Sequence, residues 1–263
     1  MTPQLSVIIP AYNEESRLPA TLDSVYRFVS GRGEEFEVLV VDDGSTDRTV
    51  EIVESYAKTH PGVRLLSYQP NQGKGHAIRT GILSAAGELL LINDADGSSP
   101  IEEVARLEAA IRDGAFVAIG SRAKPDQSRR VDALAYRRFI GNTFNAIVQK
   151  LLLPGIYDTQ CGFKLFEANA GRDLFSVATI DGFGFDVEVL YIARLRGYKT
   201  TEVPINWHNV EGSKVNVLID SPKMLLDVLT ITISSLLGRY KQLPVSQQIP
   251  TDGVKDSNVL SNK

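Results

Sequence analysis

Short runs of consecutive apolar residues alternate with longer amphipathic stretches in the first half of the chain. Such runs are typical of strands buried on both faces of a sheet, and the amphipathic stretches are typical of helices that cover those faces. The pattern therefore predicts an α/β fold with a mostly parallel central sheet. The predicted strands are 5–9, 36–41, 63–67, 88–92 and 115–120, and the predicted helices are 14–28, 47–58 and 73–85.

The second half of the chain has a less regular pattern. An arginine-rich loop over 122–138 leads into a predicted helix near 132–152, and short strands surround another helix near 184–196. The polar residues 243–263 contain prolines and a glycine and are expected to be disordered. We predict one domain over 1–242, with halves of about 1–121 and about 122–219 and an amphipathic helix over about 220–240.

Pairs of acidic residues follow two of the predicted strands. Asp42 and Asp43 come after the second strand, and Asp94 and Asp96 come after the fourth. Ligands of parallel sheets bind beyond the carboxyl ends of the strands. Carboxylates with few histidines nearby suit Mg²⁺ or Mn²⁺, so Asp94 and Asp96 are candidate metal ligands. The alternative is that these carboxylates cap the helices that follow them.

Glycine motifs of the common nucleotide-binding loops are incomplete. No Gly-x-Gly-x-x-Gly follows the first strand, which argues against a dinucleotide fingerprint. The segment 72–75 resembles part of a P-loop, but Gly75 stands where that loop needs Ser or Thr. The sequence argues against a Walker site, and Gly73, Lys74 and Gly75 are expected to open a helix that faces an anion.

Charge and cysteine content narrow the function class. The 28 Lys and Arg residues against 32 Asp and Glu residues give a net charge of -4, which argues against a nucleic-acid binder. Cys161 is the single cysteine, so the chain fits a reducing compartment, and we expect Cys161 to be a small buried residue rather than a nucleophile. No apolar run approaches the ~18 residues of a membrane span. We expect a cytoplasmic chain, peripheral on the cytoplasmic face of a membrane.

Several of these segments together resemble family 2 glycosyltransferases with the GT-A fold. Those of the second half resemble the polyprenyl-phosphate branch of that family, and its dolichyl-phosphate glucosyltransferases more than its mannosyl enzymes. The resemblance covers roughly residues 4–240, and it implies that about 1–121 is a nucleotide-binding half and about 122–219 an acceptor half. The family segments are Val7–Glu14, Val41–Asp47, Asn71–Gly75 and Asp94–Gly97, and the branch segments are Asp158–Phe166, Phe185–Glu188, Glu202–Trp207 and Glu211–Lys214.

The resemblance implies an inverting enzyme that moves a hexose, glucose from UDP-glucose, to a polyprenyl phosphate. It implies that Asp94 and Asp96 hold Mg²⁺ or Mn²⁺ on the donor diphosphate, and that Arg122 pairs with phosphate oxygens. The donor-binding residues that it implies are Pro10, Ala11, Glu14, Asp42, Asp43, Lys74, Asp94, Ser213 and Lys214.

A phosphate acceptor is largely ionised near neutral pH, because its second pKa is about 6. It needs cations to approach another anion more than it needs a general base. The arginine-rich loop supplies the candidates Arg129, Arg130, Arg137 and Arg138, whose alternative role is a solvated surface. Asp186 stands where hydroxyl-acceptor relatives have a base, so it could be a base, orient the sugar or hold an arginine. A transferase acting on a sugar hydroxyl, a sugar nucleotidyltransferase and a catalytically silent nucleotide-sugar-binding module stay open.

The predicted C-terminal helix has a broad apolar surface. Basic residues flank it, which is typical of helices that lie on anionic membrane surfaces. The alternatives are packing against the domain or a dimer contact in a homo-oligomer. The predicted interfacial face contains Met224, Leu225, Val228, Leu229, Thr232 and Leu236, widened by Leu226, Ile231, Ile233 and Leu237 and flanked by Lys223, Arg239 and Lys241.

Overall fold

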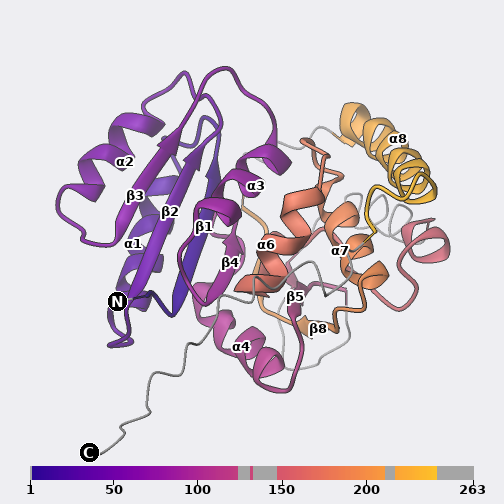
Figure 1. The fold of residues 1–263 in the computed structure, drawn as a ribbon. Coiled ribbons are helices and arrows are strands. Elements are labelled where there is room, and N and C mark those ends of the chain that lie inside the picture. The colour runs from indigo at the N-terminus through magenta and orange to yellow at the C-terminus, as the bar shows by residue number, and fades with distance from the viewer. Residues whose placement is uncertain (1, 124–130, 133–146, 211–216, 242–263) are drawn as a thin grey trace, which may run out of the picture.

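The computed structural model describes residues 2–123, 131–132, 147–210 and 217–241. A seven-stranded sheet crosses the molecule, and helices cover both of its faces (Figure 1). Its strand order is β3-β2-β1-β4-β7-β5-β8. The strands are β1 (Leu5–Ala11), β2 (Phe36–Asp42), β3 (Val63–Ser67), β4 (Leu89–Asn93), β5 (Val117–Ser121), β7 (Phe163–Glu167) and β8 (Thr200–Pro204), and β6 (Val131–Asp132) pairs with β9 (Trp207–His208) in a small second sheet.

The helices divide between the two faces of the sheet and form a hydrophobic core on each. Successive residues of a strand point to opposite faces, so Ile8 of β1 belongs to one core while Val7 and Ile9 belong to the other. The helices are α1 (Leu18–Ser30), α2 (Thr49–Ala57), α3 (Lys74–Ser84), α4 (Val104–Arg112) with the short turn η1 (Ile101–Glu103) before it, α6 (Ala168–Val177), α7 (Phe185–Leu195) and α8 (Val217–Leu236). One core contains residues of α3, α6, α7 and α8, and the other contains residues of α1, α2 and α4.

The mostly parallel sheet is confirmed, with one exception. β7 runs antiparallel to both of its neighbours, β4 and β5, whereas β1 pairs in parallel with β2 and β4. The five strands predicted in the first half all form, each within two residues of the predicted bounds. Two helices of the structure, α4 and α6, were not predicted.

The loop after β1 delays the first helix by four residues. Asn13 has a φ of 53°, a left-handed conformation that asparagine tolerates better than most residues. Its side-chain oxygen accepts a hydrogen bond from the backbone N–H of Thr46 at 2.8 Å, and its own N–H donates to Ser45 Oγ at 2.8 Å. The loop is therefore tied to the end of β2, and α1 begins only at Leu18.

Helix α8 packs one face on the domain and leaves another exposed. Met224, Val228 and Ile231 are buried in the core beside α7, so their assignment to the interfacial face was wrong. The exposed face instead consists of apolar side chains that retain between 41 and 83% of their surface. Its members are Leu225, Leu226, Leu229, Ile233, Leu236 and Leu237.

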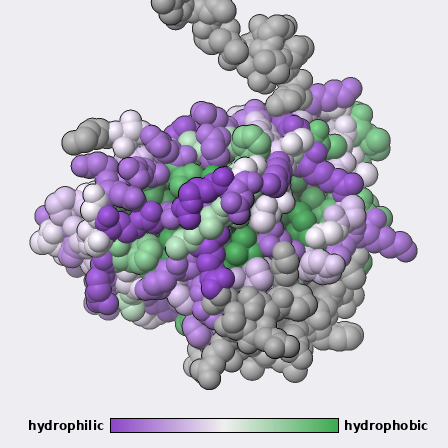
Figure 2. All heavy atoms as spheres, turned by 90° about the horizontal axis from the view of Figure 1, so that it is seen from below, coloured by the Kyte–Doolittle hydropathy of each residue, from purple (hydrophilic) through white to green (hydrophobic). Residues whose placement is uncertain are grey.

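Seen from below, the molecule shows hydrophobic residues at its surface among the hydrophilic ones (Figure 2). Within the ranges that the structure describes, no helix combines the length and apolarity needed to cross a bilayer. The predicted disordered tail, 243–263, lies outside the described residues.

Candidate functional site

The predicted site residues gather along one edge of the sheet. The carboxyl ends of β1, β2, β4 and β5 meet there, and β7 begins at the same edge because Phe163 lies opposite Asn93. Pro10 and Ala11 are the last two residues of β1 and are buried. Asp42 ends β2, Asp43 follows it, Asp94 follows β4 and Arg122 follows β5.

The first acidic pair is buried and is held by the protein itself. The Asp43 carboxylate accepts hydrogen bonds from the backbone N–H groups of Gln72 and Gly73, both at 2.8 Å. It also accepts one from the side-chain amide of Asn71 at 2.8 Å. Asp42 is fully buried beside it. Asp43 therefore fixes the turn that leads into α3.

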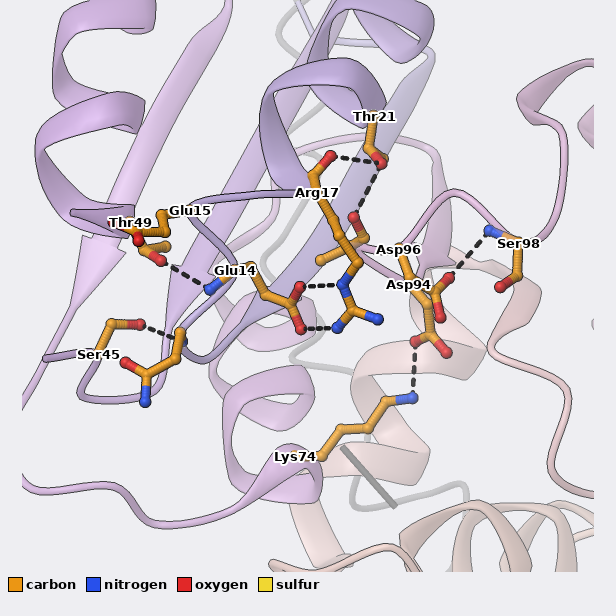
Figure 3. Close-up of polar contacts among 12 residues, drawn as sticks. Glu14, Glu15, Arg17, Thr21, Ser45, Thr49, Lys74, Asp94, Asp96 and Ser98 are labelled. Carbon is orange, nitrogen blue, oxygen red and sulfur yellow. Dashed lines mark hydrogen bonds and ion pairs between the residues drawn. The ribbon is translucent and has the colours of Figure 1, made fainter. Parts of the chain in front are cut away.

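The second acidic pair is more open. Asp94 keeps 31% of its side-chain surface exposed, and its Oδ1 lies 2.7 Å from Lys74 Nζ (Figure 3). Asp96 accepts a hydrogen bond from the backbone N–H of Ser98 at 2.9 Å. A Cβ at position 162 would overlap the Asp94 carboxylate, so Gly162 provides the space in which that carboxylate lies.

Arg17 is a site residue that the sequence analysis missed. Its guanidinium makes a bidentate ion pair with the buried Glu14, with Nε 2.7 Å from Oε2 and Nη2 on Oε1. Burial opposes the charge on Arg17, but Glu14, followed by Asp96 and Asp94, raises its pKa. Arg17 and Lys74 thus place two cations beside the Asp94 and Asp96 carboxylates (Figure 3).

The start of α3 lies against a backbone carbonyl group as well as the Asp43 carboxylate, and its contact with a ligand anion stays a prediction. The backbone N–H of Gly75 donates to the Asp181 carbonyl oxygen at 2.7 Å, and that of His76 reaches the same oxygen at 3.3 Å. A Cβ at Gly73 or Gly75 would overlap the backbone of residues 180–181. The two glycines therefore allow the segment before α7 to close over the start of α3, and the side chain of Lys74 carries the positive charge of this turn.

Asp186 is buried on the first turn of α7 and pairs with a buried lysine of β7. Lys164 Nζ lies 2.6 Å from Asp186 Oδ1 and also donates to the Cys161 carbonyl oxygen at 2.5 Å. Burial raises the pKa of Asp186, while the charges of Lys164 and Lys74 oppose that rise. One oxygen of the candidate base is thus already bound to a cation of the protein.

Arg122 pairs with a carboxylate of the protein, and its contact with phosphate oxygens stays a prediction. Its Nε and Nη2 lie 2.7 and 2.8 Å from the two oxygens of the buried Asp158. Burial opposes both charges, but the pairing raises the pKa of Arg122 and lowers that of Asp158. The guanidinium also lies 5.5 Å from the centre of the Trp207 ring. Arg122 therefore joins the ends of β5 and β9 to the loop before β7.

The comparisons with known proteins identify the family. The profile described as Glycosyl transferase family 2 matches residues 6–175, which include both acidic pairs and six of the seven strands of the main sheet. The chain belongs to glycosyl transferase family 2. This family 2 enzyme also has curated relatives that cover nearly its whole length.

Two of these relatives are dolichyl-phosphate beta-glucosyltransferases. The enzyme from Dictyostelium discoideum is 37% identical over 252 residues, which are 90% of this chain and 76% of the relative. The enzyme from Homo sapiens is 37% identical over 253 residues, 91% of this chain and 78% of the relative. The match to the glucosyltransferases confirms the branch that the second-half segments indicated.

A solved structure confirms the GT-A-like fold. Glucosyl-3-phosphoglycerate synthase from Mycobacterium tuberculosis, in complex with Mn²⁺, uridine diphosphate and glucosyl-3-phosphoglycerate, superimposes with a TM-score of 0.64 at 20% sequence identity. The match covers 90% of this chain and 80% of that one. At this identity the likeness concerns the fold alone.

The residues of this glycosyltransferase fit a hard divalent cation. Asp94 and Asp96 lie on one loop, and Gly162 leaves a cradle for the Asp94 carboxylate that any larger residue would fill. No group of three or more His, Cys, Asp and Glu side chains that could hold a metal occurs in the described part of the chain. A pair of carboxylates is what Mg²⁺ uses when substrate phosphates supply the remaining ligands.

Several predicted site residues lie outside the described residues. They are the acceptor candidates Arg129, Arg130, Arg137 and Arg138 and the donor candidates Ser213 and Lys214. Cys161 is fully buried as expected, and burial raises its pKa to about 12, which keeps the thiol protonated.

Sequence reasoning missed three charged residues at the edge of the sheet where the site lies. They are Lys164, Asp158 and Arg17. Lys164 carried a signal, because a lone charge inside the apolar strand 163–166 requires a buried partner. Arg17 and Asp158 carried none, because charged residues in loops are usually solvated.

Proposed function

We propose that this chain is an inverting transferase that moves glucose from UDP-glucose to a polyprenyl phosphate, of the dolichyl type that its relatives are named for. An oxygen of the acceptor phosphate attacks the anomeric carbon, the bond from that carbon to the diphosphate breaks, and UDP leaves. Mg²⁺ or Mn²⁺ on Asp94 and Asp96 would neutralise the negative charge that develops on the leaving diphosphate. The similarity to the dolichyl-phosphate beta-glucosyltransferases supports the donor and the acceptor.

The pairing of Asp186 with Lys164 favours a phosphate acceptor over a hydroxyl acceptor. A general base must reach the proton that it abstracts, and the carboxylate must be free to accept that proton. Asp186 is 5% exposed, and its Oδ1 lies 2.6 Å from the Lys164 ammonium. A hydroxyl acceptor would need this carboxylate released, whereas an ionised phosphate does not. The buried Lys164–Asp186 pair is thus the observation that carries the choice of acceptor.

A donor panel tests the proposal. The full chain is incubated with radiolabelled UDP-glucose, GDP-mannose or UDP-galactose and with dolichyl phosphate or dolichol, followed by extraction into organic solvent. We expect label in the organic phase with UDP-glucose and dolichyl phosphate, release of UDP, and a β-anomeric product by NMR. Label transferred to dolichol, or to a water-soluble sugar, would overturn the choice of acceptor, and no transfer to any acceptor would favour a silent binding module.

We also propose that the exposed apolar face of α8 docks on an anionic membrane surface. This face presents six large apolar side chains, and the exposed Lys223, Arg239 and Lys241 lie at its two ends. Cations beside an apolar face complement anionic head groups, each worth about 1 kcal/mol near such a surface. Docking there would bring a peripheral catalytic domain to an acceptor whose phosphate lies at the membrane surface.

Flotation with vesicles tests this contact. The full chain should float with phosphatidylcholine vesicles that contain phosphatidylserine, and the triple substitution of Leu226, Leu229 and Leu236 by Gln should abolish flotation. The matched control replaces three exposed apolar residues elsewhere, Leu83, Phe116 and Leu195, by Gln and should float as the wild type does. Equal flotation of both triple variants, or a wild-type chain that remains in the soluble fraction, would overturn the docking proposal.

A further inference from the structure

The acidic pair at the end of β4 already has a cation of the protein on it. Lys74 Nζ lies 2.7 Å from Asp94 Oδ1. Gly162 packs against the other side of the same carboxylate, and the Asp94 backbone N–H donates to the Gly162 carbonyl oxygen at 3.2 Å. The carboxylate has little room to turn away on that side, and a metal ion bound at Oδ1 would compete with the lysine for it.

The displaced ammonium needs another anion, because leaving it partly buried without one is costly. Lys74 is 23% exposed, and outside the pair the charge of Asp186 also acts on it. Asp186 is already paired with Lys164, whose Nζ lies 2.6 Å from Asp186 Oδ1. Arg17 does not move in to compensate, because its guanidinium is bound bidentately by Glu14. Among the described residues, the protein therefore offers Lys74 no equivalent place.

The diphosphate of a nucleotide would provide that place. We infer that Lys74 makes metal binding conditional on the nucleotide: its ammonium excludes a free divalent cation from Asp94 and moves to the phosphate oxygens when the metal and the nucleoside diphosphate arrive together. This inference rests on the proposed donor and metal. It makes Lys74 a positioning residue for the metal in addition to its expected contact with the donor.

A titration of the full chain with Mn²⁺, followed by the electron paramagnetic resonance signal of free Mn²⁺, tests this without turnover. In the wild type we expect weak binding of Mn²⁺ alone and a large tightening by UDP. Lys74→Met should bind Mn²⁺ alone about tenfold or more tightly than the wild type, and the tightening by UDP should fall by the same factor, because coupling between two ligands is reciprocal. Lys74→Arg, which keeps the cation, should behave as the wild type does.

The matched control is Lys58→Met, which removes an equal charge from the exposed C-terminal end of α2. It should leave Mn²⁺ binding unchanged, whereas a tenfold gain in this variant too would show a general effect of net charge and overturn the inference. Thermal unfolding checks that each variant is folded. If Lys74→Met does not fold, Lys74→Gln takes its place in the titration.

The outcomes separate the inference from the function on which it rests. Equal affinity of the wild type and Lys74→Met for Mn²⁺ alone overturns the inference and leaves the proposed metal site intact. Failure of the wild type to bind Mn²⁺ even with UDP overturns both. Asp96→Asn tests the metal site itself. If the carboxylate pair is the metal site, this variant should lose Mn²⁺ binding in the presence of UDP.

Discussion

The two acidic strand ends look alike in the sequence and differ in what satisfies them. After β2, the Asp43 carboxylate is buried and accepts hydrogen bonds from residues 71–73 on both of its oxygens. After β4, Asp94 is partly exposed and its partner is a lysine side chain. Backbone donors cannot leave without unfolding the turn, whereas a lysine side chain can rotate away. The same residue type is thus part of the fold at one end and available for a ligand at the other.

The largest effect is expected at the acidic pair after β4, Asp94 and Asp96. Asp96→Asn, or EDTA treatment of the wild type, should lower turnover about a thousandfold, since a metal contributes several kcal/mol at about 1.4 kcal/mol per tenfold. The melting temperature should stay unchanged, because the amide oxygen can still accept from Ser98. Initial rates of label transfer with and without added Mn²⁺ measure this. Full activity after exhaustive metal removal would show that the two strand ends do not differ in this way.

Gly162→Ala should lower activity about a hundredfold, the cost that misplacement of a catalytic group by about 1 Å can reach. The added methyl group would overlap the Asp94 carboxylate and push it from its position. Gly182→Ala is the matched control, because a Cβ there meets no atom within 4 Å. Steady-state kinetics of both variants decide the matter, and equal rates would mean that Asp94 does not depend on its cradle.

Asp43→Asn should cost about 3 kcal/mol of the free energy of unfolding, because it turns an amide NH₂ toward buried donors. Urea denaturation followed by circular dichroism measures this loss. Whatever activity remains should track the folded fraction. A variant as stable as the wild type but inactive would show instead that Asp43 acts as a donor-binding residue, as the resemblance implied, and the contrast between the two ends would fail.

The smallest effect is expected at Ser67, whose hydroxyl donates to Asp42 Oδ2 at 3.0 Å. Ser67→Ala removes one hydrogen bond from the buried end and should cost about 1 kcal/mol. The melting temperature should fall by about 2–4 °C for a chain of this size, with kcat and KM unchanged. A change in KM for UDP-glucose would place this end of the sheet in the binding site after all.

The sequence predicted the frame of the fold and the residues at its edge better than it predicted their partners. Buried strands such as Phe36–Asp42 are continuous apolar runs, so periodicity finds them directly. Helix α6 was missed because Ala168–Val177 contains only a narrow apolar stripe interrupted by glycine and charges.

The pairings of site residues could not be predicted, because they join distant parts of the chain. Arg122 with Asp158 and Lys164 with Asp186 are contacts of tertiary structure. No local pattern distinguishes an arginine that will meet a phosphate from one that will meet an aspartate. The predicted α8 face was wrong at Met224, Val228 and Ile231 for a related reason, since the sequence shows an apolar helix but not the side on which the domain packs.

The position of β7 has a consequence for synthesis on the ribosome. It lies between β4 and β5 in the sheet, although it follows both in the chain by more than 40 residues. Until residues 163–167 emerge, the edges of β4 and β5 that face β7 stay unpaired and cannot join each other in the native order, and exposed edges invite pairing with other chains. Gly162 and Asp94, which lie against each other, are brought together by the same late strand. The nascent chain therefore passes through a period in which the inner edges of β4 and β5 are exposed and the contact of Gly162 with Asp94 is absent, and the pairing of β7 ends both.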